Sequence, residues 1–545
     1  MTRWLDHLLV LPVVLPLAAG AVMLLIDDQH RILKTAINIG TIVALTGVAF
    51  ALLGLVDAPG SAAVWIYRLG DWPTPFAIVL VADRLSALML VLTSVLALAS
   101  MVFSVARWDR AGAHFRAMFQ FLLMGLNGAF LTGDLFNLFV WFELLLAASY
   151  GLVLHGSGTR RVRAGLHYIA VNLATSLLFL IGVSLIYGVT GTLNMADLAT
   201  RIPQVSAESR GLLETGAAVL GIAFLVKAGI WPLGFWLPTA YSGAAPPVAA
   251  MFSIMSKLGL YVVLRLWLLL FGAGSGASAH FGGDGLLLAG MATIVFGAIG
   301  VLASQDIARL AGFSVLISSG TVMAAIATAQ AGVTGPALYY LVSSTLGIGA
   351  LFMLIELLER GREPGADVLA VTREAYGEDD EDELMPTDEI GVAIPAAMAV
   401  LGLCFIGCTL VLAGLPPLSG FIAKFAVLTA LFGRPGPGMT AGVPALAWAL
   451  LGLLVFSGLT TLVAMTRAGI RTLWTREEHT VPRVRVIEIA PIVILLIATA
   501  TMTVQAEPVM RYMQAAASAL HAPQGYIQGV LSAPSGRIAP TKEGS

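Results

Sequence analysis

Apolar residues run through this chain in long blocks that short polar stretches separate. A helix that crosses a bilayer needs about 20 apolar residues, and blocks of roughly that length recur over most of the chain. They predict an all-α polytopic membrane protein with about 14 transmembrane helices. The predicted spans are residues 6–26, 33–56, 78–106, 115–132, 134–154, 164–187, 212–238, 246–271, 285–304, 306–329, 334–358, 391–432, 444–466 and 486–505.

Two of these blocks are too long or too interrupted to form simple helices. Trp231-Pro232 and Pro238 interrupt the seventh block, and Gly414-Leu415-Pro416-Pro417 interrupts the twelfth. Proline removes a helical hydrogen bond, and inside a membrane the freed carbonyl groups need protein, water or an ion as a partner. We therefore expect helices 7 and 12 to be broken at membrane depth.

The sequences around the two breaks resemble each other, since Ala228 to Phe235 can be aligned with Ala413 to Phe421. Interrupted helices at corresponding places in two halves are typical of transporter repeats whose site lies at the break. Five spans surround each break, and an odd number of spans gives the two units opposite orientations. The pattern predicts an N-terminal three-helix segment (1–110), a first repeat of helices 4–8 (111–272), a second repeat of helices 9–13 (284–467), a final helix (484–505) and a polar tail (506–545).

Composition agrees with a membrane protein, because 58% of the 545 residues are hydrophobic and only 11% are charged. Cys404 and Cys408 lie one helical turn apart in an apolar helix and are interpreted as small hydrophobic residues. The sequence has no P-loop, no glycine-rich dinucleotide loop and no Cys/His metal cluster. Neither a cofactor, nor a bound metal, nor a nucleic-acid partner is therefore expected.

The distribution of basic residues predicts how the chain is oriented. The loops after odd-numbered spans carry more lysine and arginine than the loops and tails of the opposite side. By the positive-inside rule, both termini lie on the non-cytoplasmic side of the cell inner (plasma) membrane.

One cytoplasmic loop, residues 359–390, is strongly acidic and contains the unbroken block Glu378 to Glu383. Such a block repels itself and stays solvated, so the loop is expected to be disordered. Cation attraction or docking of another subunit are the alternatives.

Four charged residues stand inside apolar blocks: Glu143, Lys227, Lys257 and Lys424. An ionised side chain in hydrocarbon costs a few kcal/mol, so such residues usually face a polar interior, a partner or an ion path. Because a desolvated lysine can give up its proton, a movable contact between a glutamate and a lysine can act as a proton switch.

Other polar residues in the blocks are assigned lesser roles. Arg265 and Glu356 lie nearer the ends of their helices, and we expect them to extend to the membrane interface. Asp83 and Arg84 could form a local ion pair, a question that the sequence leaves open. His167 opens the sixth span beside an arginine-rich loop and is a candidate for a proton-access path.

The residues around these charges resemble a known superfamily. Lys227 to Ala240, followed by Ala245-Pro246-Pro247, is similar to the signature of the antiporter-like subunits of respiratory complex I and of multisubunit monovalent-cation/proton antiporters. Trp141-Phe142-Glu143 and Gly414 to Phe425 match the same superfamily. The resemblance covers roughly residues 5–505, and it implies fourteen helices, two inverted five-helix repeats and a buried polar axis that carries protons.

The resemblance also implies roles for individual residues. Glu143 matches a fifth-helix glutamate that pairs with a seventh-helix lysine, here Lys227. Lys257 matches an eighth-helix lysine that connects inward, and Lys424 a twelfth-helix lysine near the exit. In the eleventh helix, where many relatives have a histidine and a lysine, this chain has Ser343 and Ile348. Hydroxyl groups such as those of Ser343 and Thr345 can orient water, so a path between the repeats would rely on water there.

Within the superfamily, the chain resembles the D-type subunits of the Mrp/Pha-type antiporters. Trp141 to Tyr150, the acidic loop and Asp388 to Leu418 carry this resemblance. Lys424, where M-type subunits of complex I usually have glutamate, and the short tail also favour it. The implied function is proton translocation in a monovalent cation (Na⁺ or K⁺)/proton antiporter, with other membrane subunits as partners. A proton-pumping component of a complex I-like NADH–quinone oxidoreductase or membrane hydrogenase, and a non-transporting scaffold, stay open as alternatives.

Overall fold

The computed structural model describes residues 7–27, 29–58, 64–111, 114–156, 158–360, 396–433, 445–474 and 484–532. Helices dominate this part of the chain. Its two short strands, β1 (Trp65–Arg68) and β2 (Val79–Ala82), form an antiparallel hairpin that pairs Trp65 with Ala82. Twelve of the described helices are long and apolar enough to cross a membrane, which confirms an all-α polytopic membrane protein.

The helices follow one another with short connections. They are α2 (Leu11–Leu25), α3 (Arg31–Asp57), α4 (Arg84–Val105), α5 (Phe115–Leu131), α6 (Leu135–Val153), α7 (Thr159–Thr190), α8 (Met195–Arg201), α9 (Ala207–Ala228), α10 (Leu237–Gly243), α11 (Pro246–Phe271), α12 (Gly283–Ala303), α13 (Ile307–Ile326), α14 (Ala331–Glu359), α16 (Ala396–Ala413), α17 (Ser419–Leu431), α18 (Ala445–Gly469), α19 (Val486–Val504), α20 (Ala506–His521) and α21 (Gln524–Ser532). Single turns of tighter or wider helix are η1 (His7–Leu9), η2 (Leu69–Asp71), η3 (Trp108–Arg110), η4 (Ile202–Gln204), η5 (Gly276–Ser278) and the π-turn η6 (Ile470–Trp474).

Within the described residues each predicted span overlaps one helix or a pair of helices, although α10 lies mostly beyond the predicted end of the seventh span at residue 238. The seventh span corresponds to α9 and α10, and the twelfth to α16 and α17. The helices α2, α5 and α17 are apolar but shorter than the twelve long ones. The apolar blocks therefore located the helices well, although the number of membrane crossings is not settled by helix length alone.

The seventh helix breaks one residue after Ala228. Gly229 adopts φ 73°, a left-handed conformation that glycine reaches without a Cβ clash, and ends α9. The backbone N–H of Ile230 turns back and donates to the Leu225 carbonyl at 2.9 Å. The next N–H, that of Trp231, donates to Thr293 Oγ1 of α12 at 2.8 Å. The freed backbone groups thus find partners within the protein, as a break at membrane depth requires.

The twelfth helix ends in the same way. Gly414 adopts φ 75° directly after α16, and the Leu415 N–H donates to the Leu410 carbonyl at 3.0 Å. Helix α17 resumes at Ser419. Both interruptions predicted from proline and glycine are present, and they share one backbone geometry.

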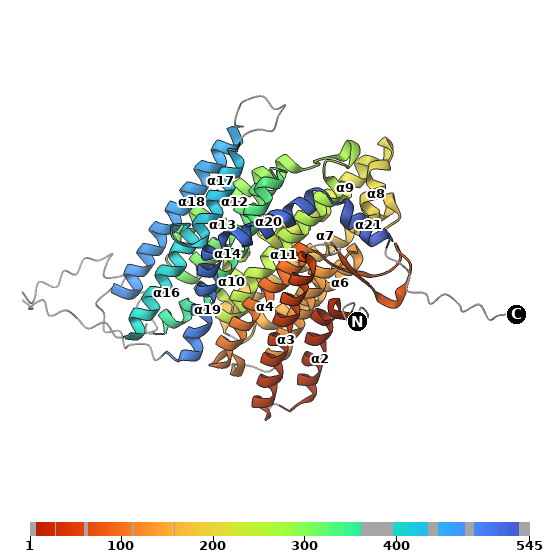
Figure 1. The fold of residues 1–545 in the computed structure, drawn as a ribbon. Coiled ribbons are helices and arrows are strands. Elements are labelled where there is room, and N and C mark those ends of the chain that lie inside the picture. The colour runs from red at the N-terminus through yellow and green to blue at the C-terminus, as the bar shows by residue number, and fades with distance from the viewer. Residues whose placement is uncertain are drawn as a thin grey trace, which may run out of the picture.

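Two helices form the interior of the bundle. Helix α14 packs against α11, α13, α16, α17, α19 and α20, and its most apolar stretch is wholly buried. Helix α11 packs against α4, α9, α13 and α14 and is nearly as buried. Figure 1 shows α18 at one edge of the bundle and α2 and α3 away from it. Polar side chains on α11 and α14 are therefore shielded from lipid by the surrounding helices.

The predicted polar tail contains two helices. Residues 506–532 form α20 and α21, and α20 lies across the bundle against α4, α11 and α14 (Figure 1). Met513, Ala516 and Leu520 form its buried face. These apolar residues recur at helical spacing but are too few to make an apolar block, so block length alone missed them.

Some predictions lie outside the described residues. The acidic loop is described only at Glu359 and Arg360, so the block Glu378 to Glu383 and its predicted disorder lie outside the structure's description. The end of the tail, residues 533–545, lies outside it as well.

Candidate functional site

Glu143 and Lys227 lie near each other but form no direct ion pair. Lys227, on α9, is 6% exposed, and its Nζ lies 5.0 Å from the centroid of the Phe142 ring on α6. Its Nζ also lies 3.5 Å from Asn172 Oδ1 on α7. Glu143 is close enough to act electrostatically on Lys227, yet within the described residues its Oε1 is buried without a hydrogen-bond partner. Lys227 thus contacts the side-chain amide of Asn172, while the carboxylate of Glu143 lies nearby without a direct contact.

Local structure fixes both ends of this arrangement. Asp134 caps α6 by accepting a hydrogen bond from the Asn137 N–H at 2.9 Å, which sets the start of the helix that carries Glu143. Lys227 occupies the last turn of α9, directly before the break at Gly229. A positive charge in the last turn is stabilised by the partial negative charge of the helix C-terminus.

Lys257 is completely buried on α11, and its partners are hydroxyl groups. Its Nζ donates to Ser318 Oγ at 2.7 Å and to Ser319 Oγ at 3.3 Å, both on α13. Ser318 Oγ in turn lies 2.7 Å from Ser344 Oγ on α14. A chain of hydrogen bonds therefore joins three helices, from the lysine of α11 to the centre of the bundle.

The neighbouring serine of α14 faces the second break. Ser343 Oγ lies 2.7 Å from Ser419 Oγ, and Ser419 is the first residue of α17. Two consecutive residues of α14 therefore face different partners. Ser344 contacts Ser318, the partner of Lys257, and Ser343 contacts the start of α17 at the twelfth-helix break. The Ser344 hydroxyl also donates to the Tyr340 carbonyl of its own helix at 2.7 Å, whereas among the described residues the Thr345 hydroxyl bonds only within the helix, to the Leu341 carbonyl at 2.6 Å, and takes no part in the link.

Lys424 lies across the second break. It is 7% exposed on α17, and its Nζ donates to the carbonyl oxygen of Ala413, the last residue of α16, at 3.0 Å. Within the described residues it forms no ion pair with a carboxylate. A helix C-terminus therefore takes the place of a counter-ion.

His167 stays apart from these residues. It lies on an exposed part of α7, and its ring centroid is 5.7 Å from that of Phe235. The structure thus brings Glu143, Lys227, Lys257, Ser343 and Lys424 to the interior and leaves His167 and Thr345 outside the chain of polar contacts.

Sequence reasoning missed five residues of the site: Asn172, Ser318, Ser319, Ser344 and Ser419. Serine and asparagine are common enough in membrane helices that a single one gives little signal. The one sequence cue for Asn172 is an amide within an otherwise apolar stretch of the sixth span.

The structure answers the open question about Asp83 and Arg84, and it contradicts the expectation for Arg265. Asp83 and Arg84 do not pair with each other, because Asp83 accepts from Arg265 Nη2 at 2.7 Å and Arg84 pairs with Asp57 at 3.1 Å. Arg265 does not extend to an interface either, since only 5% of it is exposed. Packing of the β-hairpin end beside α11 brings Asp83 to Arg265, and a buried guanidinium requires such a partner.

Glu356 is likewise buried in an ion-pair cluster instead of extending outward. It is 7% exposed, pairs with Arg360 and accepts a hydrogen bond from the Trp108 indole. Arg360 also pairs with Glu488 of α19 at 2.7 Å. These charges join α14 to α19 at one end of the bundle and lie apart from the lysines.

The sequence of this chain matches the model of a known protein family. The family model described as "NADH:quinone oxidoreductase/Mrp antiporter, TM" matches residues 132–452. That range includes every lysine of the site, together with Glu143 and the serines of α13 and α14.

Two curated relatives resemble nearly the whole chain. A protein of Rhizobium meliloti, named as the D subunit of a probable K(+)/H(+) antiporter, is 60% identical over 98% of this chain and 99% of its own length. An Alkalihalophilus pseudofirmus protein, named as the D subunit of a Na(+)/H(+) antiporter, is 31% identical over 97% of this chain and 100% of its own length.

Solved structures show the same architecture. A chain of the Mrp complex from a Dietzia species superposes with a TM-score of 0.78 at 25% identity, covering 97% of this chain and 100% of its own. A chain of respiratory complex I from Thermus thermophilus superposes with a TM-score of 0.71 at 21% identity, covering 96% of this chain and 99% of its own. The second likeness concerns the fold alone.

Proposed function

The chain belongs to the NADH:quinone oxidoreductase/Mrp antiporter transmembrane family, among the D-type subunits of Mrp-type cation/proton antiporters, and from this premise we propose that it conducts protons along its buried lysines. It is part of a transporter and not an enzyme. The proposed path runs from Glu143 and Lys227 through Lys257 to Lys424.

The observation that carries this proposal is the chain of hydrogen bonds from Lys257 through Ser318 to Ser344. A hydroxyl donates one hydrogen bond and accepts others, so it can pass a proton on when a neighbour offers one. Ser343 and Ser419 extend the same kind of contact to the second break. Water would connect the segments that lie between these contacts, as the sequence led us to expect for the eleventh helix.

Glu143 and Lys227 form the proposed switch. With Lys227 against Asn172, the lysine touches an amide instead of a carboxylate, so no counter-ion in direct contact holds its proton. With Lys227 against Glu143, the charged form of the lysine would be stabilised. Movement of one side chain between the two partners would thus take up a proton and release it toward Lys257.

The finer architecture also belongs to this proposal. We infer fourteen membrane crossings, with α2, α5 and the α16–α17 pair included, and two inverted repeats over residues 111–272 and 284–467. The shared geometry at Gly229 and Gly414 supports the repeats. The basic loops support both termini on the non-cytoplasmic side of the plasma membrane.

We further propose K⁺ as the exchanged cation and the other membrane subunits of an Mrp-type complex as partners. The relative at 60% identity, which is named for K⁺ and H⁺, supports the cation, and the Mrp complex structure supports the partners. The redox-driven alternative is supported by the family description, which names both kinds of complex, and by likeness of fold, but by neither of the two curated relatives.

The test is cation/proton exchange in membrane vesicles that contain the full complex. Addition of K⁺ to vesicles with an imposed pH gradient should dissipate the gradient, and Na⁺ should do so less. If Na⁺ acts and K⁺ does not, the proposed cation is wrong. If neither cation acts in a correctly assembled complex, the proposed function is wrong.

A further inference from the structure

Lys257 is the first member of a polar stripe along α11. Tyr261 and Arg265 follow it at intervals of four residues, so the three side chains lie on one face of the helix. Four helical residues rise ~6 Å, which places Arg265 about 12 Å along the axis from Lys257. The stripe runs from the buried lysine toward the end of the bundle at which α20 and α21 lie.

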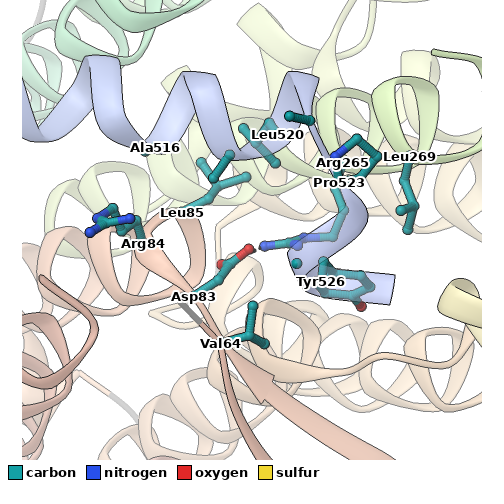
Figure 2. Close-up of a pocket in the computed structure, with 13 residues that line it drawn as sticks. Val64, Asp83, Arg84, Leu85, Arg265, Leu269, Ala516, Leu520, Pro523 and Tyr526 are labelled. Carbon is teal, nitrogen blue, oxygen red and sulfur yellow. Dashed lines mark hydrogen bonds and ion pairs between the residues drawn. The ribbon is translucent and has the colours of Figure 1, made fainter. Parts of the chain in front are cut away.

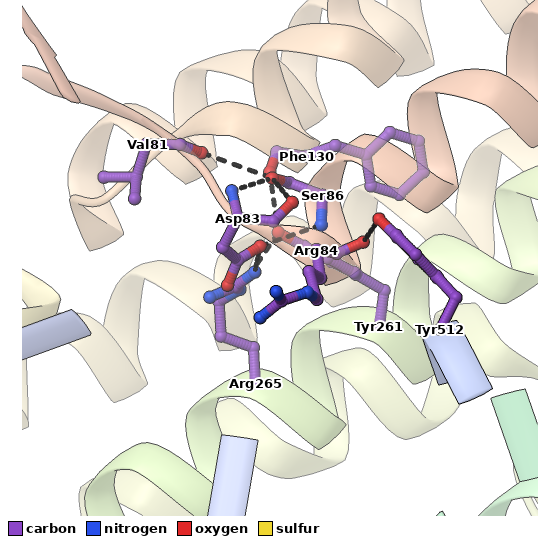
Figure 3. A network of polar contacts seen from close by, with 8 residues as sticks. All are labelled: Val81, Asp83, Arg84, Ser86, Phe130, Tyr261, Arg265 and Tyr512. Carbon is purple, nitrogen blue, oxygen red and sulfur yellow. Dashed lines mark hydrogen bonds and ion pairs between the residues drawn. The ribbon is translucent and has the colours of Figure 1, made fainter. Parts of the chain in front are cut away.

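Arg265 is held firmly at the end of this stripe (Figure 3). Its Nη2 donates to Asp83 Oδ1 at 2.7 Å, and its Nε donates to the Tyr261 hydroxyl at 3.0 Å. The Tyr261 hydroxyl donates onward to the Phe130 carbonyl at 2.6 Å. The guanidinium also lies over the Tyr526 ring, 5.3 Å from its centroid. The chain therefore fixes one permanently charged group from several sides.

A cavity of about 220 Å³ lies directly beyond this arginine. Asp83, Arg265, Leu520, Pro523 and Tyr526 are among the residues that line it, and the turn between α20 and α21 forms one wall (Figure 2). The lining is mostly apolar, but Asp83, Arg265 and Tyr526 bring polar groups to it, and a cavity of this volume has room for several water molecules beside them. Arg265 is thus the member of the stripe that lines the cavity, at the opposite end of the stripe from Lys257.

Tyr261 and Lys257 do not contact each other through a hydrogen bond in this structure. Lys257 donates to the serines of α13, whereas Tyr261 donates to α5, and the two side chains form no hydrogen bond with each other. The stripe therefore contains three kinds of group. The lysine can exchange a proton, the tyrosine hydroxyl can donate and accept hydrogen bonds, and the arginine cannot lose its proton.

We propose that Arg265 is a positively charged plug that closes a side branch between Lys257 and the Asp83–Tyr526 cavity, and that Asp83 holds this plug in place. The inference rests on the proposed proton path through Lys257. A fixed arginine in a narrow pathway repels protons and cations, and because it does not deprotonate it cannot relay a proton itself. Coupled exchange requires such closure, since an open branch would let protons cross without the cation.

The alternative is that the Asp83–Arg265 pair only stabilises the fold. Removal of one partner of a buried pair then impairs assembly but produces no proton leak in the complexes that do assemble. The two roles are separated by measuring leak per assembled complex.

The experiment measures decay of an imposed pH gradient in vesicles containing the full complex, with neither Na⁺ nor K⁺ present. Arg265→Gln should speed this decay several-fold relative to the unmodified complex, after normalisation to the amount of assembled complex. Arg84→Gln is the matched control, because Arg84 lines the same cavity but pairs with Asp57 and does not contact Tyr261. Its decay should equal that of the unmodified complex.

A second variant covers the case in which Arg265→Gln fails to assemble. Asp83→Asn keeps the shape of the side chain and leaves the arginine in the chain without its counter-ion, so it should also speed the decay, by a smaller factor. Unchanged decay in every assembled variant of the pair would overturn the proposal and leave a structural role.

The double variant Arg265→Gln/Lys257→Ala tests the route. If the branch passes through Lys257, the added alanine should return the leak to the level of the unmodified complex. A leak that persists in the double variant overturns the side branch but not the proposed function. By contrast, normal K⁺/H⁺ exchange by Lys257→Ala alone would overturn the proposed proton path through Lys257, and the side branch with it, while leaving cation/proton exchange intact.

Discussion

Lys257 donates a hydrogen bond to Ser318 over 2.7 Å, so a hydroxyl and not a carboxylate is the first partner of this completely buried lysine. Ser318 passes the contact to Ser344 at the same distance. Two features follow from this relationship. Among the described residues the lysine has no counter-ion that would hold its proton, and its side chain is directed toward the helix that contacts the second break.

Ser318→Ala should slow K⁺/H⁺ exchange strongly. The change removes the first hydroxyl of the chain and leaves the Lys257 ammonium with its longer contact alone, and an unmade buried hydrogen bond costs about 1–3 kcal/mol. Ser319→Ala is the matched control, because it removes only the 3.3 Å contact and should have a much smaller effect. Exchange rates in vesicles, normalised to assembled complex, decide the matter. Equal rates for Ser318→Ala and the unmodified complex would contradict a hydroxyl relay.

Glu143→Gln and Lys227→Ala should each abolish exchange. The first keeps the size of the side chain but removes the charge that Lys227 would approach, and the second removes the group that moves. Asn172→Leu should reduce exchange less, since it removes only one of the two resting positions of the lysine.

His167→Ala serves as the control for this series, because His167 is exposed on α7 and contacts none of the lysines. Its exchange rate should remain normal. If both charge variants transport normally in assembled complexes, protons take another path.

Lys257→Arg and Lys424→Arg should keep the positive charge yet slow exchange severely. A relay site must release its proton, which a buried lysine can do and an arginine cannot. Recovery of the intact complex after purification reports assembly, and exchange in vesicles reports transport. Normal exchange by Lys424→Arg together with loss in Lys257→Arg would mean that only the first repeat conducts.

The docking of α20 should weaken in acid. His521 Nε2 lies 2.9 Å from Thr334 Oγ1 of α14, and burial, with a smaller electrostatic contribution from His280, lowers the pKa of His521 below its ordinary value. The folded chain therefore binds fewer protons here than the unfolded chain does. Stability from this group is full at neutral pH and is lost as the pH falls through the lowered pKa.

Hydrogen exchange of the α20 backbone amides in the purified complex measures this effect. Protection should fall between neutral pH and about pH 5, after correction for the intrinsic exchange rate, because free histidine titrates near 6.5. His521→Gln keeps a polar side chain but removes the titration, so its protection should vary less with pH. Equal pH dependence in the two proteins would contradict a role for His521.

The sequence by itself determined the helices, the breaks and the buried charges. The length of an apolar block is a local property, and hydrocarbon imposes a minimum length on any segment that crosses it. The breaks at Gly229 and Gly414 followed from glycine and proline within such blocks, because these residues alter the backbone wherever they occur. Glu143, Lys227, Lys257 and Lys424 stood out because a charge in an apolar block is costly.

Only the tertiary structure decided which groups meet. Ser318 and Ser344 are ordinary residues in their helices and become a relay because α11, α13 and α14 pack together. Arg265 finds Asp83 182 positions earlier in the chain, and in this pairing the side chain is buried instead of extending to the membrane interface. Contacts between distant helices depend on how their surfaces fit, and no local pattern encodes that fit. The energetic cost of a charge in an apolar block thus identified the charged residues in the sequence, and the packing of the helices determined their partners.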